Sequence, residues 1–237
     1  MDVSCDDSEL QTGEIMLDLR NCDCMDMMKE FPDKYFDLVI SDPPYGINHA
    51  EIAGKQSNKQ YGKSAAPKKE YIAKDWDKKS PEKEYFIELF RVSKNQIIWG
   101  ANYMTSHLPP SMGWIFWDKD NGTNGFSDGE LAFSSFDRAL RKYKYTWMGM
   151  IQGDMKNKEC RIHPTQKPVA LYRWLLKNYA KEGDKILDTH LGSGSIAIAC
   201  HQMGFDLTAS ELDKDYFDAM KKRVDAEISQ EILFELK

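Results

Sequence analysis

Two short stretches of this sequence combine carboxylates, glycines and an aromatic ring in patterns that suit chemistry on a small ligand. The first is Ser41-Asp42-Pro43-Pro44-Tyr45, directly after the apolar run 36–40. Because the two prolines fix φ and supply no N–H, the backbone leaves the preceding strand stiffly. Asp42 then offers two acceptor oxygens and Tyr45 a flat face, which suit a planar ring with an exocyclic amine. The alternative here is an ordinary proline-rich turn.

The second stretch, Asp188–Ser195, is a glycine loop between a strand that ends at Asp188 and a helix over 195–203. The next strand, 205–210, ends just before Glu211. Glycines let a backbone approach a ligand closely, and an acid about 20 residues further on suits ribose hydroxyls. The loop is neither Gly-x-Gly-x-x-Gly nor a P-loop, and Asp188 would repel a pyrophosphate but attract a cation. The pattern favours S-adenosylmethionine over NAD or ATP, with a plain α/β connection as the alternative.

Strands and helices alternate along the chain and must position these two stretches. We expect strands over 15–19, 36–40, 96–100, 114–117, 130–136, 143–150, 185–188 and 205–210. We expect helices over 22–30, 195–203 and 216–227, one that begins at Pro81 and continues through Phe90, and another that begins at Pro168. The β-α-β order implies parallel strands with right-handed crossovers. The sequence therefore predicts an α/β fold in one domain, 1–237, with a mixed, mainly parallel sheet and helices on both faces.

Composition restricts the class of protein. The chain has 237 residues, 41% hydrophobic and 30% charged, with a mean hydropathy of -0.61. It has no apolar run of about 18 residues and no apolar leader, so we expect no membrane association and no secretion. The five scattered cysteines fit a reducing cytoplasm, and Cys22-Asp23-Cys24 lacks the second pair that a zinc site needs. We therefore expect a cytoplasmic protein without a metal.

Charge is unevenly distributed. The net charge of -6 argues against broad, sequence-blind binding of nucleic acid, but residues 138–168 hold eight basic residues against two acids. Segment 46–79 lacks apolar periodicity and is rich in lysine. It begins immediately after Tyr45, so we expect a mobile loop in the position of a lid over a site.

With two further stretches, the sequence resembles the amino-methylating DNA methyltransferases, in particular the β-class N6-adenine enzymes of small phage and prophage type. The motifs are Asp42–Tyr45 (motif IV), His163–Pro168, which is His-Pro-Thr-Gln-Lys-Pro (motif X), Asp188–Ser195 (motif I) and Glu211–Asp213 (motif II). In most of that superfamily motifs I and II come before motif IV. The resemblance therefore implies a circularly permuted, Rossmann-like class I methyltransferase fold that binds S-adenosylmethionine.

The resemblance also implies roles for individual residues. The catalytic residues would be Asp42, Pro43, Pro44 and Tyr45. The cofactor-binding residues would be Asp23, Cys24, Asp42, His163, Thr165, Lys167, Asp188, His190, Leu191, Gly192, Ser193, Gly194, Ser195, Glu211 and Leu212. Asp23 would lie beside the cofactor adenine, or alternatively cap a helix. Thr189 and His190 depart from the proline and phenylalanine that are usual in motif I.

The reaction implied is transfer of a methyl group to the exocyclic N6 amine of an adenine flipped out of the duplex. Asp42 and the Pro43 carbonyl would accept the two amine hydrogens, while Tyr45 stacks on the base. Aspartate before the two prolines favours adenine in this family. N4 of cytosine, an RNA or amide amine, and a non-catalytic nucleic-acid-binding relative remain alternatives.

Double-stranded DNA is the expected partner. A small target-recognition region at about 120–161 would contact it through basic residues interleaved with aromatic ones, namely Arg138, Arg141, Lys142 and Lys144. The alternative for this segment is an amphipathic strand with a polar outer face. The lysine-rich loop 49–79 is the other candidate for DNA contact, with a merely solvated loop as its alternative. The resemblance leaves a homodimer and a cognate restriction endonuclease open as further partners.

Overall fold

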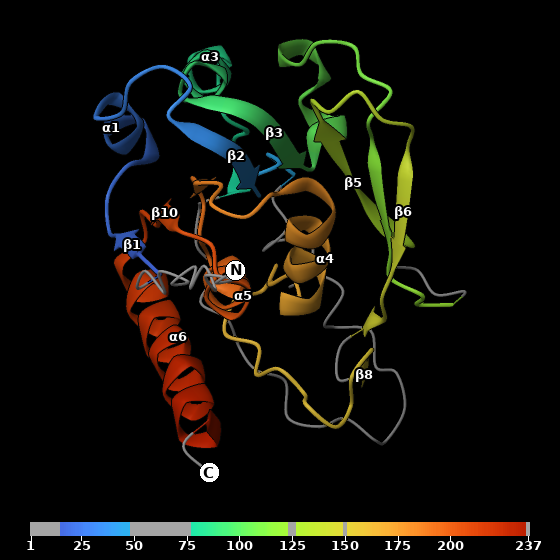
Figure 1. Cartoon of the computed structure of the whole chain (residues 1–237). Coiled ribbons are helices and arrows are strands. Elements are labelled where there is room, and N and C mark those ends of the chain that lie inside the picture. The colour runs from blue at the N-terminus through green and yellow to red at the C-terminus, as the bar shows by residue number, and fades with distance from the viewer. Residues whose placement is uncertain (1–14, 48–76, 123–126, 149–150, 236–237) are drawn as a thin grey trace, which may run out of the picture.

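A single eight-stranded sheet runs through the computed structural model, which describes residues 15–47, 77–122, 127–148 and 151–235 (Figure 1). In spatial order its strands are β1 (Leu17–Arg20), β10 (Leu207–Ser210), β9 (Ile186–Asp188), β2 (Phe36–Ser41), β3 (Ser93–Trp99), β5 (Gly129–Ser134), β4 (Ile115–Asp118) and β6 (Arg141–Lys144). All neighbours are parallel except β5, which is antiparallel to both β3 and β4. The predicted mixed, mainly parallel sheet is confirmed.

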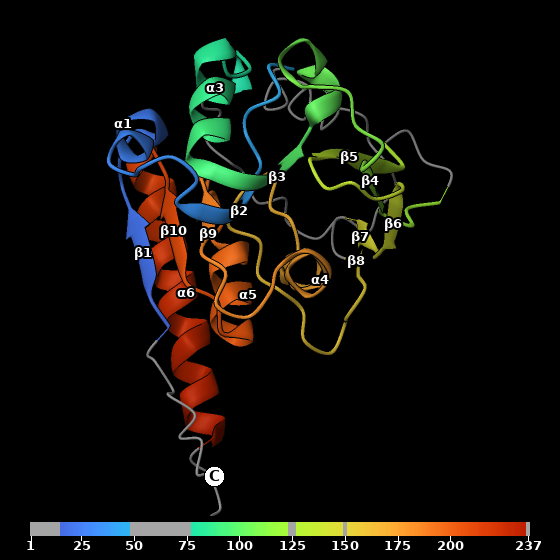
Figure 2. The ribbon, with the colours of Figure 1, turned by 45° about the horizontal axis from the view of Figure 1, so that its top comes forward.

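Helices cover both faces of the sheet (Figure 2). On one face lie α1 (Cys24–Lys29) and α3 (Lys83–Val92), and on the other α4 (Val169–Tyr179), α5 (Ser195–Met203) and α6 (Lys214–Glu235). Two short 3-10 helices, η2 (Ala101–Tyr103) and η3 (Thr105–His107), follow β3, and β7 (Trp147–Met148) pairs with β8 (Ile151–Gln152). Within the described ranges, no helix is long and apolar enough to cross a membrane.

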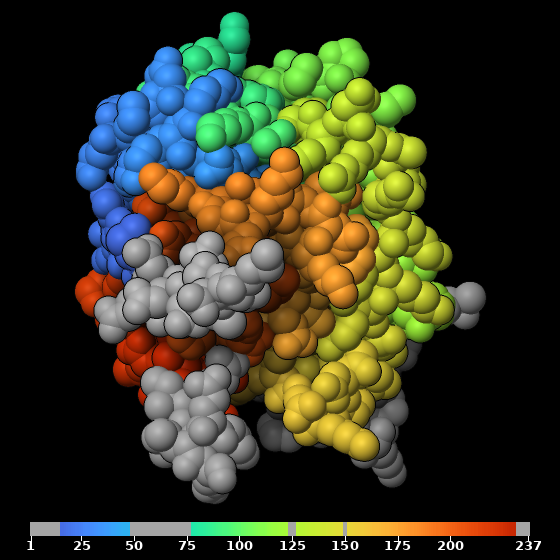
Figure 3. Space-filling view, in the orientation of Figure 1, coloured from blue at the N-terminus to red at the C-terminus, as the bar shows by residue number. Residues whose placement is uncertain are grey.

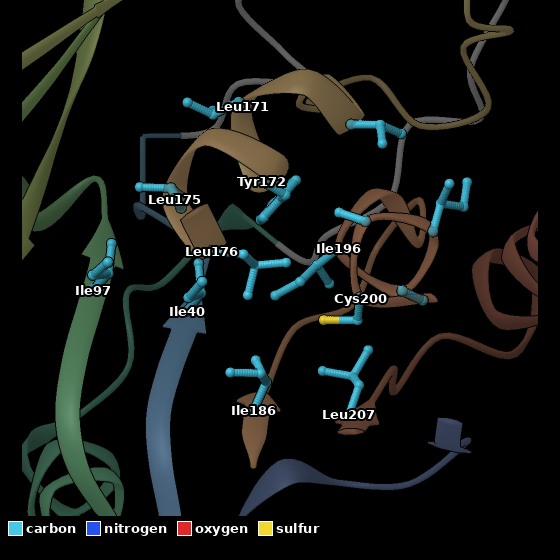
Figure 4. Close-up of a cluster of buried hydrophobic side chains, with 14 of the residues drawn as sticks. Ile40, Ile97, Leu171, Tyr172, Leu175, Leu176, Ile186, Ile196, Cys200 and Leu207 are labelled. Atoms are coloured by element: carbon cyan, nitrogen blue, oxygen red, sulfur yellow. The ribbon is translucent and has the colours of Figure 1, made fainter. Parts of the chain in front are cut away.

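The apolar run in β2 is continuous because the strand is buried on both faces. Leu38 and Ile40 point into the core beneath α4 and α5, whereas Val39 points into the core beneath α1 and α3. Figure 4 shows the first of these cores, where Ile40 lies beside Leu176 of α4. The same alternation continues past the strand, so Asp42 lies on the side of Leu38 and Ile40, where Lys167 precedes α4.

The strands that carry the two candidate stretches are neighbours, although one comes early and the other late in the chain. Leu38 of β2 pairs with Ile186 of β9, and Val39 pairs with Leu187. Because the pairing is parallel, Asp42 and Asp188 emerge at the same edge of the sheet. The chain therefore has the permuted order that the sequence predicts.

One predicted strand was wrong. The pattern indicated a strand over 143–150, but β6 ends at Lys144 and the chain then turns around the end of β4. There the indole of Trp117 donates to the Tyr145 carbonyl oxygen at 3.1 Å, and Trp147 begins a separate two-residue strand. Most of the predicted loop 46–79 lies outside the described residues, so its mobility stays a prediction.

The core shown in Figure 4 gives a stability prediction. Leu176 is completely buried between α4 and the sheet, so Leu176→Ala should lower the free energy of unfolding by about 2–5 kcal/mol. Leu140→Ala removes the same atoms from a side chain that is 57% exposed and should change it by less than about 0.5 kcal/mol. Urea unfolding of both variants checks this, and equal losses would contradict the packing described.

Candidate functional site

The ends of β2 and β9 are joined by a closed ring of three buried hydroxyls. Ser41 Oγ lies 2.7 Å from Thr189 Oγ1 and 3.0 Å from the Tyr85 hydroxyl, and the last two are 2.7 Å apart. Tyr85 belongs to α3, so the ring ties that helix to both strands. Thr189 stands where the related motif has proline, and its hydroxyl supplies one corner of the ring.

The glycine loop after β9 is fixed at both ends by carboxylates. Asp188 is buried and accepts from the His190 N–H at 3.0 Å, and burial raises its pKa to about 8. Glu211 accepts from the Gly192 N–H at 2.8 Å and from the Asp213 N–H at 2.9 Å. The predicted ribose acid thus also positions the loop.

A cavity of about 500 Å³ opens between this loop and α1, within the roughly 300–1,000 Å³ usual for small-molecule sites. Its walls include Asp23, Cys24, Pro44, Tyr85 and His190. Asp23 also accepts from the Met25 N–H at 2.7 Å, so the alternative of a helix cap holds as well. Burial lowers the pKa of His190 to about 4, so its imidazole is neutral near pH 7.

These residues fit S-adenosylmethionine. The cavity wall has an acid and a neutral planar ring, and Asp188 and Glu211, at the glycine loop outside that wall, are carboxylates of the kind that would suit a cation and hydroxyls. Because His190 carries no charge, it does not repel a sulfonium.

Other predicted cofactor residues lie against α6. His163 packs edge-on against Tyr216 of α6 with ring centroids 4.3 Å apart, and its Nδ1 is 3.0 Å from Thr165 Oγ1. The Ser193 carbonyl oxygen accepts from Arg223 of α6 at 2.7 Å. Leu191, Gly194 and Ser195 complete this buried turn, whereas Leu212 is an exposed apolar side chain just after Glu211. The structure places His163 and the glycine loop against the same helix, α6, and the part of all these residues in binding stays a prediction.

Asp42 lies within a buried network of charges. Its Oδ2 is 2.5 Å from Lys167 Nζ, and its Oδ1 accepts from the Tyr45 hydroxyl at 2.7 Å. Lys167, whose side chain is only 2% exposed, is also 3.0 Å from Glu130 Oε2, and Glu130 Oε1 is 2.5 Å from Lys119 Nζ. Two carboxylates are thus matched by two ammonium groups.

The pKa values follow from this pairing. Burial raises the pKa of Asp42, and Glu130 adds to the rise while the Lys167 ammonium opposes it. Burial also raises the pKa of Glu130, but Lys167 and Lys119 outweigh it and hold that pKa at about 2. Burial lowers the pKa of Lys167, and the two carboxylates outweigh it, so the lysine stays charged. The charges of Glu130 and Lys167 are therefore retained because they are paired, and the same pairing opposes the effect of burial on Asp42.

Tyr45 is held by contacts to its ring and to its backbone. It stacks on Tyr103 with centroids 5.4 Å apart and planes 18° apart, and Tyr103 is 52% exposed. Asp77 accepts from the N–H groups of Tyr45 and Gly46 at 2.8 and 3.0 Å. Gly100, with φ of 63°, lies directly beside the ring. Tyr45 therefore lies between Tyr103 and Gly100, with its hydroxyl on Asp42.

Sequence reasoning missed four residues of this site: Lys119, Glu130, Asp77 and Tyr103. Glu130 opens β5, which runs antiparallel to its neighbours, so its start lies at the edge where the parallel strands end. The predicted strand over 130–136 is confirmed as β5, but the residue pattern does not reveal that this strand is antiparallel to its neighbours. Asp77 lies near the end of the lysine-rich segment 46–79, whose composition predicts a mobile loop and does not indicate a single anchoring residue.

The predicted DNA-contacting residues lie at the outer edge of the sheet, in and near β6, on the right-hand side of Figure 3. Lys142 pairs with Asp118 and Lys144 with Asp120, each at 2.9 Å, on the exposed surface. The interleaved Tyr143 faces inward and stacks on Trp174 of α4.

Arg138 and Arg141 are also exposed, and Arg138 donates to the Asn178 carbonyl oxygen at 2.6 Å. The strand is therefore amphipathic, with its basic side chains outward.

Comparison with known proteins places the chain in context. A family profile described as DNA methylase, of the N6 and N4 type, matches residues 94–222, more than half of the chain. That segment contains Glu130, motif X and the glycine loop, while Asp42 precedes it. Among curated proteins, the type II methyltransferase M.HpaI of Haemophilus parainfluenzae is 25% identical over 85% of this chain and 72% of its own length. M2.MboI of Moraxella bovis is 24% identical over 84% of both chains.

Solved structures of DNA methylases share the fold. M1.HpyAVI in complex with S-adenosylmethionine has a TM-score of 0.53 at 18% identity, covering 88% of this chain and all of that one. The DNA modification methylase TTHA0409 of Thermus thermophilus, also complexed with S-adenosylmethionine, has a TM-score of 0.53 at 16% identity, covering 89% and 93%. The cytosine-N4-specific PvuII methyltransferase has a TM-score of 0.54 at 11% identity, covering 88% and 87%.

Gly100 provides a test of how Tyr45 is held. A Cβ at position 100 would lie 2.0 Å from Tyr45 Cε1, so Gly100→Ala must displace the ring as well as strain a positive φ. Gly183→Ala has the same backbone cost, about 1–2 kcal/mol, at φ of 81° with open space around it. We expect Gly100→Ala to lose about 1–3 kcal/mol more than this control in urea unfolding. Equal losses would mean that Tyr45 does not occupy the position described.

Proposed function

Because this chain belongs to the DNA methylase family of N6 and N4 methyltransferases, we propose that its target is the N6 amine of an adenine in duplex DNA. The chain is a DNA methyltransferase that uses S-adenosylmethionine. Within that family we further assign it to the β-class enzymes of small phage and prophage type. One observation carries it: Asp42, followed by two prolines and an aromatic ring, leaves β2 beside the strand end that carries Asp188 and the glycine loop.

The chemical problem is that an exocyclic aromatic amine is a poor nucleophile, since its lone pair is delocalised into the ring. Two acceptors that take the amine hydrogens draw the nitrogen toward tetrahedral geometry and localise the lone pair. We assign these roles to a carboxylate oxygen of Asp42 and to the carbonyl of Pro43. Their contribution is greater in the transition state than in the ground state, so it raises the rate rather than only the affinity.

S-adenosylmethionine, when bound, supplies a methyl group activated by a positively charged sulfur. The residues that would hold it are Asp23, Cys24 and His190 in the cavity wall and Asp188 and Glu211 at the glycine loop. Asp188 is nearly neutral at pH 7 in the free protein, and a cationic ligand would favour its ionised form. Glu211 retains lone pairs for ribose hydroxyls beyond the two N–H groups that it binds.

The other predicted cofactor residues have a supporting place in this proposal. They belong to the glycine loop, to motif X or to the position after Glu211, and they are His163, Thr165, Leu191, Gly192, Ser193, Gly194, Ser195 and Leu212. Holding the methyl donor and the amine in line would account for much of the rate.

The adenine must leave the duplex to reach Asp42, and Tyr45 with Tyr103 would provide the stacking surface for it. Cytosine N4 is the second candidate, because the fold is shared with a cytosine-N4-specific enzyme. Aspartate rather than serine before the two prolines favours adenine.

We place the reaction in the cytoplasm of a bacterium or of a phage-infected host, where a homodimer and a matching restriction endonuclease are further proposals.

Replacement of Asp42 tests the proposed chemistry. Asp42→Ala should lower kcat for methyl transfer to duplex DNA by about 100- to 1,000-fold, because one of the two amine acceptors is lost. Binding of S-adenosylmethionine should stay measurable by calorimetry. Asp225→Ala, which removes an exposed acid on α6, serves as the control and should retain activity.

Mass spectrometry of the digested product identifies the methylated nucleoside in the same experiment. N6-methyladenine would support the proposal, and N4-methylcytosine would replace it with the second candidate. Full activity in Asp42→Ala would refute the role given to the carboxylate.

The basic edge at β6 predicts a salt dependence. Lys142→Gln with Lys144→Gln should weaken binding to duplex DNA of any sequence and reduce the slope of log K against log salt by about 0.9 for each lysine that contacts a phosphate. The matched control is Lys214→Gln with Lys221→Gln, two exposed lysines in ion pairs on α6. Fluorescence anisotropy between about 50 and 200 mM salt, where such effects are large, measures both slopes. An unchanged slope in the first pair would remove β6 from the interface.

A further inference from the structure

We propose that Lys167 occupies the place of the substrate amine on Asp42 and shifts onto Glu130 when that amine binds. Glu130 and Lys167 are then positioning residues of the reaction: they act through Asp42 and do not touch the transferred group. The inference rests on the proposed function only in requiring an amine as the methyl acceptor, whether of adenine or of cytosine.

Both oxygens of Asp42 are occupied in the structure. Lys167 Nζ lies 2.5 Å from Oδ2, and the Tyr45 hydroxyl lies 2.7 Å from Oδ1. The ammonium presents N–H donors to a carboxylate oxygen, which is the same type of contact that an exocyclic amine would make. Each oxygen keeps a second lone pair, but the Asp42 side chain is only 16% exposed and Lys167 covers Oδ2, so the substrate amine gains that oxygen by displacing the ammonium.

Lys167 already contacts a second carboxylate, that of Glu130. Glu130 Oε2 is already 3.0 Å from its Nζ, so a small tilt of the ammonium exchanges one acceptor for the other. Glu130 is itself held in place, since its other oxygen is 2.5 Å from Lys119 Nζ. The rings of Tyr45 and Trp99 lie 5.6 and 5.4 Å from the ammonium and favour a cation between them.

The lysine has a role before the substrate arrives. Besides Lys167, the titratable groups around Asp42 are Glu130 on β5, Asp188 at the end of β9, and the hydroxyls of Tyr45 and Tyr172. These groups are acids, the Lys119 ammonium lies one group further away on Glu130, and burial favours a neutral Asp42. Without the ammonium the carboxyl would take up a proton and lose one of its acceptor positions. Lys167 therefore keeps Asp42 ionised and oriented until the amine replaces it.

Two variants have opposite consequences. In Lys167→Met the acid limb of the kcat profile should move to higher pH by about one to three units, because Asp42 loses its cation. In Glu130→Gln that limb should move to lower pH, because a nearby negative charge is gone. Glu130→Gln should also lower kcat by about tenfold or more at about pH 7.5, because Lys167 no longer has a charged group to move to.

The controls repeat the same chemical changes elsewhere. Glu88→Gln breaks the ion pair with Arg91 on α3, and Lys94→Met breaks the pair with Asp37, and both should leave the profile unmoved. Lys167→Arg keeps the charge and should return the acid limb toward that of the unmodified protein. Thermal melting of every variant identifies any that fails to fold, and if Lys167→Met fails, the opposite shift expected for Glu130→Gln carries the test.

Methyl transfer is measured as tritium incorporated into duplex DNA, so the result does not depend on which base is modified. Affinity for S-adenosylmethionine is measured in parallel by calorimetry, and Lys167→Met should change it by less than about threefold. A tenfold or greater loss would place Lys167 on the cofactor and overturn the inference. Losses of kcat that are the same at every pH in both variants would mean a structural role only, and would overturn it equally.

Discussion

The burial of negative charge at one edge of a sheet is the constraint on which the rest of this structure depends. Asp42, Glu130 and Asp188 lie close together, largely out of water, where isolated carboxylates are expensive. Each is accommodated differently. Asp42 and Glu130 share the ammonium of Lys167, and Glu130 also binds Lys119. Asp188 lacks so close a cation among the described residues, and its pKa rises to about 8.

Sheet topology produces this concentration of charge. In a parallel sheet with helices on both faces, all strand ends of one polarity meet at one edge, so β2 and β9 deliver their aspartates side by side. The antiparallel β5 adds Glu130 at the same edge because its beginning, not its end, lies there. Lys167 enters from the segment before α4, which packs across the ends of β2 and β3. Four parts of the chain that are distant in sequence thus meet around Asp42.

This geometry explains how far the sequence alone could lead. Asp42 and Asp188 were recognisable because each ends an apolar run, and parallel pairing follows from the β-α-β order. Glu130 was not, since the direction of a strand in a mixed sheet leaves no mark on its own residues. The inward face of Tyr143 was equally hidden, because alternating basic and aromatic residues fit a nucleic-acid surface and an amphipathic edge strand alike. The pairing of Lys167 with Asp42 joins two distant motifs, and motif spacing carries no information on such a contact.

The free protein carries substitutes for the positive or hydrogen-donating groups that its ligands would bring. At Asp42 the substitute is the ammonium of Lys167, which offers N–H donors as a substrate amine does. At Asp188 it is a proton, which a cationic ligand would release by favouring the ionised carboxylate. In the free protein, neither Asp42 nor Asp188 therefore carries an uncompensated charge in its buried site. The proposed reaction requires these acids to be open to ligand, whereas folding requires them to be neutralised, and exchangeable partners would satisfy both requirements in one arrangement.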